Sequence, residues 1–247
     1  MQDKKPYDDI IFGRNNVLEA LKGGREIDKI LIAGDHNGSL KKITALARDA
    51  KIPVISAGRA KLEQLACGEN HQGVVAFAAQ KNYVSPEDIL AVAAQRGEKP
   101  FVIIADEIVD PHNLGAIIRS ADAFGAHGVI ISKRRAVGLT ASVEKAAGGA
   151  LNHVPVAKVS NLAATMDKLK ENGLWIYGSD MNADKRYFDE KFDTPLALVV
   201  GNEGSGMSRL IREKCDILLS IPMHGHVSCL NASVAAGVIM QEIAKYR

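Results

Sequence analysis

Cysteine is scarce in this chain of 247 residues, which contains only Cys67, Cys215 and Cys229. An odd number of cysteines without CxxC spacing argues against a disulfide framework and against a thiolate zinc site. Long apolar runs of about 18 residues are also missing, so we expect no transmembrane helix. The first residues are charged rather than apolar, so no secretory signal is visible. These absences predict a cytoplasmic protein with reduced thiols.

A large excess of charge of either sign is likewise absent, because the formal net charge is only +2. This balance permits nucleic-acid binding without demonstrating it. Hydrophobic residues make up 47% of the chain and charged residues 24%, which is ordinary for a globular protein with a full core. A length of 247 residues is comfortable for two domains.

Residues 8–80 alternate short helical and extended patterns and predict a small α/β domain. The helices are expected at 13–21, 40–50 and 60–66, and the strands at 27–33, 53–56 and 74–78. Residues 81–99 are predicted to form a linker that contains a helix. Ser85-Pro-Glu-Asp88 supports that helix, because it combines an N-cap serine, a proline at the first helical position and two first-turn acids.

Residues 100–247 alternate strand and helix patterns and predict a second, larger α/β domain with a mostly parallel sheet. Phe101-Val-Ile-Ile-Ala is a continuous apolar run, typical of a strand that is covered on both faces. Further strands are expected at 128–132, 175–178, 196–200 and 217–221, and helices at 114–124, 162–171, 207–213 and 231–246. Three polar segments follow such strands, at 106–113, 201–206 and 222–230. Ligands bind beyond the carboxyl ends of parallel strands, so we expect a site there.

The first polar segment leads into a helix that carries Asn113 near its start and Arg119 one residue off the apolar stripe. Two interpretations of these residues remain open. In one, Asn113 only caps the helix and Arg119 is a solvated surface arginine. In the other, Arg119 presents its planar guanidinium to a phosphate or a carboxylate.

The other two segments are dense in glycine and small polar residues. The glycines of Gly201-Asn-Glu-Gly-Ser-Gly206 let backbone approach a ligand closely, although an ordinary strand-to-helix turn remains the alternative. In the last segment His224 and His226 have no nearby partner except Cys229, so we predict no metal site. Asn231 opens a helix that is apolar nearly all round at its start, which indicates deep burial or a dimer interface.

Together the three segments resemble the motifs of the SpoU (TrmH-type) RNA 2′-O-ribose methyltransferases in the SPOUT superfamily. The matching stretches are Asp110-Pro-His-Asn-Leu-Gly-x3-Arg119-Ser, Gly201-Asn-Glu-Gly-x-Gly206 and Ile221-Pro-Met-x-Gly-x-Val-Ser-x-Leu-Asn-x-Ser-Val-Ala235. The N-terminal Ile11-Phe-Gly-Arg-Asn-Asn-Val-Leu-Glu-Ala-Leu21 and His71-Gln-Gly73 resemble the L30e-like substrate-binding domain of one subgroup. The likeness therefore covers nearly the whole chain.

The resemblance implies an L30e-like RNA-binding domain at 8–80 and a trefoil-knotted SPOUT methyltransferase domain at 100–247. Rules that start from sequence patterns would not predict the knot, because knots are almost absent from protein folds. The resemblance also implies S-adenosylmethionine as cofactor, bent among three knot loops. It implies an obligate homodimer through the C-terminal domain, with the active site near the interface.

Carried over position by position, the resemblance assigns roles to individual residues. The implied catalytic group is Asn113, Arg119, Glu203, Ser228 and Asn231. The implied cofactor-binding residues are Gly178, Ser179, Gly201, Asn202, Gly204, Ile221, Met223, Ser228 and Leu230. The implied RNA-binding residues are Arg14, Asn15 and Arg119. Cys229 departs from the family pattern, in which serine or glutamate is more usual, but it is small and we expect it to be tolerated.

The implied reaction is an in-line displacement in which a ribose 2′-hydroxyl attacks a sulfonium methyl group. Arg119 is the base suspected in the family, yet a guanidinium is effectively always protonated. We therefore expect Arg119 to grip the target phosphate and to stabilise the developing alkoxide. Glu203 or Ser228 would help to relay the proton.

The N-terminal domain makes the chain most similar to the bacterial enzymes that methylate a guanosine of 23S rRNA in the peptidyl-transferase region. The alternatives are 2′-O-methylation of tRNA or of an rRNA adenosine, and a non-catalytic RNA-binding or ribosome-assembly protein on the same fold. A nucleotide-binding oxidoreductase is disfavoured, because the chain has no dinucleotide-binding fingerprint. RNA is expected as the partner because only RNA carries a 2′-hydroxyl.

Overall fold

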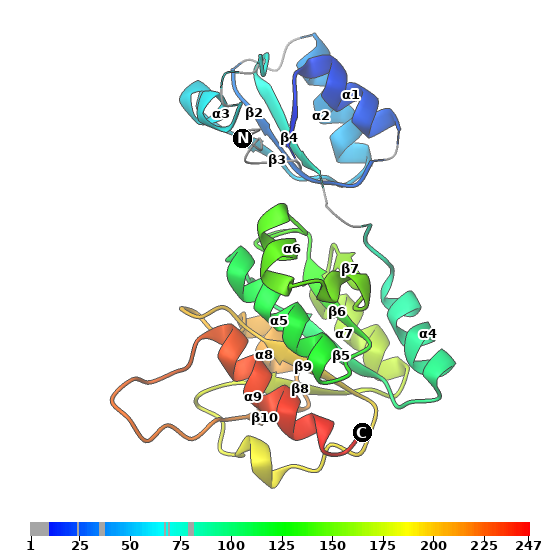
Figure 1. The fold of residues 1–247 in the computed structure, drawn as a ribbon, viewed down its shortest axis with the longest axis vertical. Helices are drawn as coiled ribbons and strands as arrows, with labels where there is room; N and C mark the ends of the chain where they lie inside the picture. Colours follow the sequence, from blue (N-terminus) through cyan, green and yellow to red (C-terminus); the bar gives the residue numbers. More distant parts are fainter. Residues whose placement is uncertain (1–9, 24, 35–37, 67, 69, 79–81) are drawn as a thin grey trace. The chain divides into compact units, whose positions relative to one another are not determined.

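The computed structural model describes residues 10–23, 25–34, 38–66, 68, 70–78 and 82–247. Cys67 and the predicted domain boundaries at residues 8, 80 and 81 lie outside these ranges. The chain divides into two compact units (Figure 1). The N-terminal unit extends to Asn82 and includes Gly138–Ala141, and the C-terminal unit comprises Tyr83–Val137 and Ser142–Arg247.

The described part of the N-terminal unit is a four-stranded sheet with three helices. Its elements are β1 (Ile10–Phe12), α1 (Arg14–Lys22), β2 (Ile27–Ile32), α2 (Ser39–Asp49), β3 (Val54–Ser56), α3 (Arg59–Ala66) and β4 (Val74–Ala78). The strand order is β1-β4-β2-β3, with β2 and β3 parallel and the other neighbours antiparallel. The expected helices and strands are confirmed to within one residue. The sequence prediction missed β1, because three residues are too few to show a periodic pattern.

The C-terminal unit is built on a six-stranded sheet in the order β10-β8-β9-β5-β6-β7, and every neighbouring pair is parallel. Its strands are β5 (Phe101–Ala105), β6 (Gly128–Ser132), β7 (Val156–Val159), β8 (Trp175–Ser179), β9 (Leu196–Val200) and β10 (Ile217–Leu219). Its helices are α4 (Pro86–Arg96), α5 (Pro111–Ala123), α6 (Ala141–Ala147), α7 (Leu162–Glu171), α8 (Arg209–Lys214) and α9 (Ala232–Ala244), with short 3₁₀ turns at Ala150–Asn152 and Tyr187–Asp189. The predicted α/β class is thereby confirmed.

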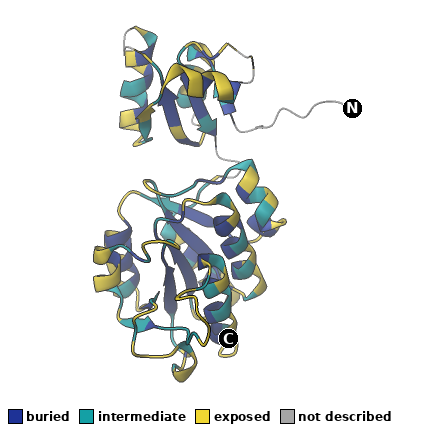
Figure 2. Ribbon diagram, turned by 90° about the vertical axis from the view of Figure 1, so that its left-hand side faces the viewer, coloured by how far each residue is buried: buried dark blue, intermediate teal, exposed yellow. Residues whose placement is uncertain are grey.

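Helices cover both faces of this sheet (Figure 1). One face is packed by α4, α7 and α8, whose side chains join Val102 and Ile104 of β5 in one buried cluster. On the other face α9 packs against β9, and α5 packs against α9. As the apolar run predicted, β5 is buried along its whole length, and so is its neighbour β9 (Figure 2). This sandwich fixes the strand ends that carry the polar segments.

Some elements of the C-terminal unit differ from the sequence prediction. The helix α6 and the strand β7 were missed, because α6 has only seven residues and β7 carries Lys158 at the edge of the sheet. The strand β10 ends at Leu219 rather than at Ile221, since Pro222 follows and the chain turns away there. Among the described helices, none has both the length and the apolar character that crossing a membrane requires. The trefoil knot and the homodimer stay predictions.

The helix α4 of the C-terminal unit begins as its capping sequence predicts. Ser85 Oγ accepts a hydrogen bond from Asp88 N at 3.1 Å, and the Asp88 carboxylate accepts one from Ser85 N at 2.8 Å. These hydrogen bonds from Ser85 hold the pKa of Asp88 below its usual value. At the other end Gly97 adopts a left-handed conformation with φ of 67°, which closes the helix.

A buried imidazole lies between strand β5 and the segment that precedes it. His127 is 1% exposed, and its Nδ1 accepts a hydrogen bond from Phe101 N at 3.0 Å. Because a backbone N–H can only donate, Nδ1 carries no proton, and Nε2 donates to the Glu98 carboxylate at 2.9 Å. Burial lowers the pKa of His127 below 6.5, and Arg96 adds to this effect while Glu98 opposes it. The ring is therefore neutral in the folded protein near neutral pH.

This neutral ring gives a prediction for stability against pH. The unfolded chain binds a proton at His127 near pH 6.5, whereas the folded chain binds it only at lower pH, so the folded state is favoured above about pH 6.5. We expect the thermal midpoint of the wild type to fall more steeply between pH 7.5 and pH 5 than that of His127→Gln. The measurement is calorimetry of both proteins over this range, and parallel curves would contradict the prediction.

Candidate active site

Four neighbouring strands, β10, β8, β9 and β5, end at the same edge of the C-terminal sheet. The three polar segments that the sequence singled out follow β5, β9 and β10. Parallel strands place their carboxyl ends together, so the segments meet although more than a hundred residues separate Asp106 from Leu230. The expectation that the three polar segments meet at one edge of the sheet is confirmed.

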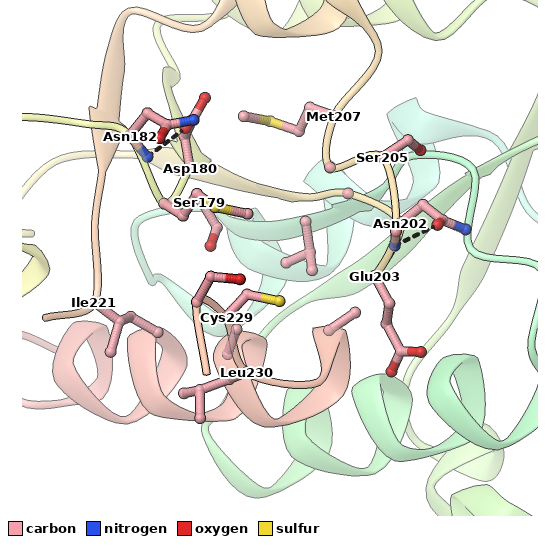
Figure 3. Close-up of a pocket in the computed structure, with 18 of the residues that line it drawn as sticks. Ser179, Asp180, Asn182, Asn202, Glu203, Ser205, Met207, Ile221, Cys229 and Leu230 are labelled. Atoms are coloured by element: carbon pink, nitrogen blue, oxygen red, sulfur yellow. Dashed lines mark hydrogen bonds between the residues drawn. The ribbon is translucent and has the colours of Figure 1, made fainter. Parts of the chain in front are cut away.

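A pocket with a volume of about 280 Å³ opens at this edge (Figure 3). Three chain segments form most of its wall, namely residues 179–182 from the end of β8 onward, residues 200–207 from the end of β9 onward, and, after β10, Ile221, Met223 and residues 228–230. Ala232 and Ala235 of α9 close it on one side, and Arg212 of α8 lies at its border. Its lining combines apolar side chains with exposed backbone and a few polar groups, which is the usual make-up of a small-molecule site.

Nearly all of the expected cofactor-binding residues line this pocket. They are Ser179, Gly201, Asn202, Gly204, Ile221, Met223, Ser228 and Leu230. Gly178 is the exception, because it is buried one residue further back in β8. A Cβ on Gly178 would lie 2.8 Å from both Cys215 Sγ and Met207 Cε, so the glycine makes room for the packing beneath the pocket floor.

The loop after β9 is held in shape by its own backbone. Asn202 N donates to Gly206 O at 3.0 Å, and Gly206 N donates to Asn202 O at 2.8 Å. The Asn202 side chain adds two bonds, because Oδ1 accepts from Gly204 N at 2.9 Å and Nδ2 donates to Glu107 O at 3.0 Å. Gly201 lies so close to Met207 N that a Cβ would be only 2.2 Å from it. The glycines therefore shape a narrow backbone turn on the pocket wall.

Beside the pocket, one carboxylate joins two of the polar segments to α9. Glu203 Oε1 accepts hydrogen bonds from Asn113 Nδ2 at 3.0 Å and from Asn231 Nδ2. Asn231 Nδ2 also donates to Asn113 Oδ1 at 2.9 Å. Figure 3 shows the Glu203 side chain directed toward α5 and α9. Asn113 is buried, whereas Glu203 and Asn231 are exposed, so the cluster has a solvent-facing side.

Asn231 is also held by hydrogen bonds with the first turn of α9, the helix that it caps. Its Oδ1 accepts from Ser233 N at 3.0 Å and from Val234 N at 3.3 Å, which caps α9. Its Nδ2 is then directed at Glu203. The Asn113–Glu203–Asn231 cluster is therefore a preorganised carboxylate with its amide donors already in place, a suitable arrangement for orienting a reacting hydroxyl.

Arg119 and Ser228 are not part of this cluster. Arg119 lies on the exposed side of α5 and does not line the pocket. Its guanidinium passes beside Gly148, where a Cβ would be 3.5 Å from Nη1, and it forms no ion pair with any described residue. Ser228 lines the pocket and is exposed. The structure thus unites Asn113, Glu203 and Asn231 and leaves Arg119 outside, because Arg119 lies six positions after Asn113 and therefore on another face of α5.

Sequence reasoning missed several pocket residues. Asp180 and Arg212 form an ion pair at the border, and this pairing raises the pKa of Arg212. The segment after β8 also contributes Met181 and Asn182, of which Asn182 N donates to Asp180 Oδ1 at 2.8 Å. The position of Asp180 directly after a parallel strand was the available signal. Within the described residues, no group of three or more His, Cys, Asp or Glu side chains is arranged to hold a metal ion.

In the N-terminal unit Arg14 is held at the start of α1. Its backbone N donates to Gln72 Oε1 at 3.1 Å, and its Nε donates to Gln72 O at 2.9 Å. Its Nη1 also donates to Ser39 Oγ, at 3.4 Å, at the start of α2. Asn15 follows on α1 and is exposed. Of the three residues that the resemblance assigned to RNA, Arg14 and Asn15 thus lie at one end of α1, whereas Arg119 lies on α5 of the other unit.

Comparison with known proteins identifies the family to which the fold belongs. The family model described as SpoU rRNA Methylase family matches residues 100–241, and the one described as RNA 2′-O ribose methyltransferase substrate binding matches residues 10–84. A TrmH family tRNA/rRNA methyltransferase of Bacillus subtilis (strain 168), YacO, is 47% identical over 240 residues, which cover 97% of this chain and 96% of that protein. A relative of the same description from Staphylococcus aureus (strain MSSA476) is 46% identical, with 97% of each chain covered.

Solved structures agree with this relationship. The SpoU methyltransferase AviRb from Streptomyces viridochromogenes is 28% identical with a TM-score of 0.61, covering 96% of this chain and 88% of that one. A second AviRb structure, in complex with the cofactor AdoMet, is 27% identical with the same TM-score and covers 96% of this chain and 89% of that one. The fold and the relatives together define an RNA methyltransferase. The chain belongs to the SpoU rRNA methylase family.

Proposed function

We propose that this protein transfers a methyl group from S-adenosylmethionine to a ribose 2′-hydroxyl of RNA, in a guanosine of 23S rRNA. The observation that carries the proposal is the Asn113–Glu203–Asn231 cluster, which stands beside the pocket at the carboxyl edge of the sheet. AviRb, which is 27% identical, was crystallised with AdoMet, and this supports the same cofactor here.

The pocket fits S-adenosylmethionine in its chemistry. The tight turn at Gly201 brings backbone within reach of a ligand, since a Cβ there would collide with Met207 N. Ile221 and Leu230 offer apolar surface for an adenine ring, and Ser179, Asn202 and Ser228 offer polar groups. When bound, the cofactor supplies an electrophilic methyl group. The protein's task is then to exclude water and to hold the two reacting groups in line.

Within the cluster, each residue has a distinct role. Asn113 and Asn231 donate to Glu203 Oε1, so Oε2 is the carboxylate oxygen that stays available to accept a hydrogen bond from the 2′-hydroxyl. Glu203 would orient this hydroxyl and accept its proton during the transfer. Ser228, on the pocket wall, would be the other group that helps to relay the proton.

Arg119 contributes its charge from a second protomer. Its guanidinium is exposed, lies outside its own pocket and has no carboxylate partner among the described residues. A homodimer that packs the α5 and α9 surfaces together would bring Arg119 of one protomer to the pocket of the other. The exposed Val109 and Val234, 58% and 50% accessible, supply apolar area for such an interface. Arg119 then binds the target phosphate and stabilises the developing alkoxide.

The N-terminal unit supplies the preference for rRNA. Arg14, fixed by Gln72 and Ser39, and the neighbouring Asn15 present one basic and one amide side chain at the start of α1. RNA loops are recognised by such groups through phosphates and unpaired base edges. The relatives are described as tRNA/rRNA methyltransferases, so tRNA is the competing substrate.

Methyl transfer to unmodified 23S rRNA and tRNA transcripts tests this choice. With labelled S-adenosylmethionine, we expect kcat/KM for 23S rRNA to exceed that for tRNA at least about 100-fold, equivalent to about 2.7 kcal/mol. Digestion to nucleosides should place the label in guanosine. Preference for tRNA, or label in adenosine, would reject the proposed substrate while leaving the chemistry intact. RNA binding without transfer to either RNA would favour a non-catalytic RNA-binding protein.

A further inference from the structure

The loop that follows β6 carries three consecutive cations, Lys133, Arg134 and Arg135. We name residues 133–135 the basic loop. β6 pairs with β5 in parallel, with Ile131 opposite Ala105, so the basic loop leaves the sheet beside the segment that leads from β5 into α5. That segment ends at the helix that carries Asn113 and Arg119. The basic loop therefore adjoins the first motif of the site.

Two contacts hold the basic loop against this neighbouring segment. Arg135 Nη1 donates to Glu107 Oε1 at 3.0 Å, and two residues later Val137 N donates to Ile108 O at 2.9 Å. Glu107 and Arg135 both have a φ of 55°, an unfavourable conformation for residues other than glycine. The contact between Arg135 and Glu107 and the neighbouring hydrogen bond from Val137 N to Ile108 O stabilise this backbone conformation. Since Asn202 Nδ2 donates to Glu107 O, the basic loop is also tied to the pocket wall.

The basic loop has more positive charge than its surroundings neutralise. Within the described residues, the side chains of Lys133 and Arg134 form no ion pair and no hydrogen bond, and Arg134 is exposed. Arg135 pairs with Glu107 through one nitrogen, but its side chain is 80% exposed. Three cations and one carboxylate leave two positive charges uncompensated, on a loop that is held by the contacts of Arg135 and Val137.

Cations around α7 and α8 of the same unit are arranged differently. Each of the following is paired with a carboxylate: Lys170 with Asp216, Lys214 with Asp167, Arg212 with Asp180, and Arg209 with Glu213. The chain as a whole has a formal net charge of only +2. Positive potential in this unit is thus concentrated at the cations that have no carboxylate partner. Two of these cations, Lys133 and Arg134, belong to the basic loop beside the site.

We propose that the basic loop binds backbone phosphates of the substrate RNA next to the target nucleotide. The inference rests on the proposed function, since it takes RNA as the substrate. Lys133 and Arg134 contact the phosphates, for which the guanidinium of Arg134 has the matching bidentate geometry. Arg135 is a positioning residue that Glu107 holds in place. Phosphate contacts of this kind fix the register of the RNA and carry no base preference.

The test compares two double variants of the full-length chain that remove the same charge. Lys133→Ala/Arg134→Ala removes the unpaired cations, and Lys168→Ala/Arg209→Ala removes two exposed cations from α7 and α8. Binding to an unmodified 23S rRNA transcript is measured at several salt concentrations. We expect the first variant to raise Kd at least about tenfold and to reduce the slope of log Kd against log salt by about 2. The second variant should stay within about twofold of the wild type.

Kinetics and a conservative variant separate phosphate binding from a structural role. Phosphate contacts persist from ground state to transition state, so KM for RNA should rise in Lys133→Ala/Arg134→Ala while kcat stays unchanged. Arg134→Lys, which keeps the charge, should retain most of the affinity. The same Kd and salt slope in both double variants would overturn the proposal. This comparison decides the role of the basic loop even if the wild type binds RNA without methylating it, a result that would reject the proposed function alone.

Discussion

Replacing Arg119 with alanine is expected to lower kcat for methyl transfer at least about 100-fold and to leave the Kd for S-adenosylmethionine unchanged. Removing one group that stabilises a developing oxyanion costs about 100- to 1,000-fold in comparable enzymes. Arg119 does not line the pocket of its own protomer, so the cofactor loses no direct contact within that protomer. Single-turnover kinetics with saturating RNA, together with calorimetric titration of the cofactor, measure the two quantities. Equal losses in cofactor affinity and in rate would contradict this assignment.

The companion variant Arg119→Lys distinguishes electrostatic stabilisation from proton abstraction. Lysine keeps the positive charge, but its ordinary pKa lies near 10.4 and that of arginine above 12. If Arg119 were the base, the pH–rate profile of Arg119→Lys would shift toward lower pH. We expect a lower kcat with the wild-type pH profile, because the charge and not the titration of residue 119 acts in the reaction.

Replacing Gly201 with alanine is the second change for which we expect a large effect, on cofactor affinity. The new Cβ would lie 2.2 Å from Met207 N and 2.3 Å from Gly206 C, and both are backbone atoms that no rotamer change can move. The turn must open, which disrupts the paired hydrogen bonds between Asn202 and Gly206. Overpacking of this kind costs about 1–3 kcal/mol or more, so the Kd for S-adenosylmethionine should rise about 10- to 100-fold.

Gly225→Ala is the matched control for this change. Gly225 belongs to the segment after β10, does not line the pocket, and has no atom within 4 Å of the position of a Cβ. Its alanine variant should keep the wild-type affinity for S-adenosylmethionine. If Gly201→Ala binds the cofactor as well as Gly225→Ala does, the close backbone approach has no role in the pocket.

The parallel sheet and the edge at which the polar segments meet could be predicted from the sequence, for physical reasons. Continuous apolar runs such as Phe101–Ala105 mark strands that are buried on both faces, and alternation with helices makes them parallel. Parallel strands carry their following loops to one edge, which is why the polar segments were expected to meet. The glycines of 201–206 are visible as a motif because only glycine tolerates the approach of Met207 N at Gly201.

The detailed geometry of the site did not follow from the sequence. Glu203 contacts Asn113 and Asn231 only because the irregular segment after β10 returns to the end of β9, and no local pattern encodes that path. Asp180 and Arg212 belong to no motif, and their pairing depends on the packing of α8 beside β8. The ion pair between Glu107 and Arg135 likewise joins two loops whose proximity comes from strand order.

The position of the transferred methyl group tests the central claim most directly. The wild type is incubated with labelled S-adenosylmethionine and an unmodified 23S rRNA transcript, and the RNA is then hydrolysed in alkali. Alkaline cleavage requires a free 2′-hydroxyl, so a methyl group on that oxygen protects the adjacent phosphodiester bond. We predict that the label remains in alkali-resistant dinucleotides. Label recovered in single nucleotides would place the methyl group on a base and would contradict the account of a site built to activate a ribose hydroxyl.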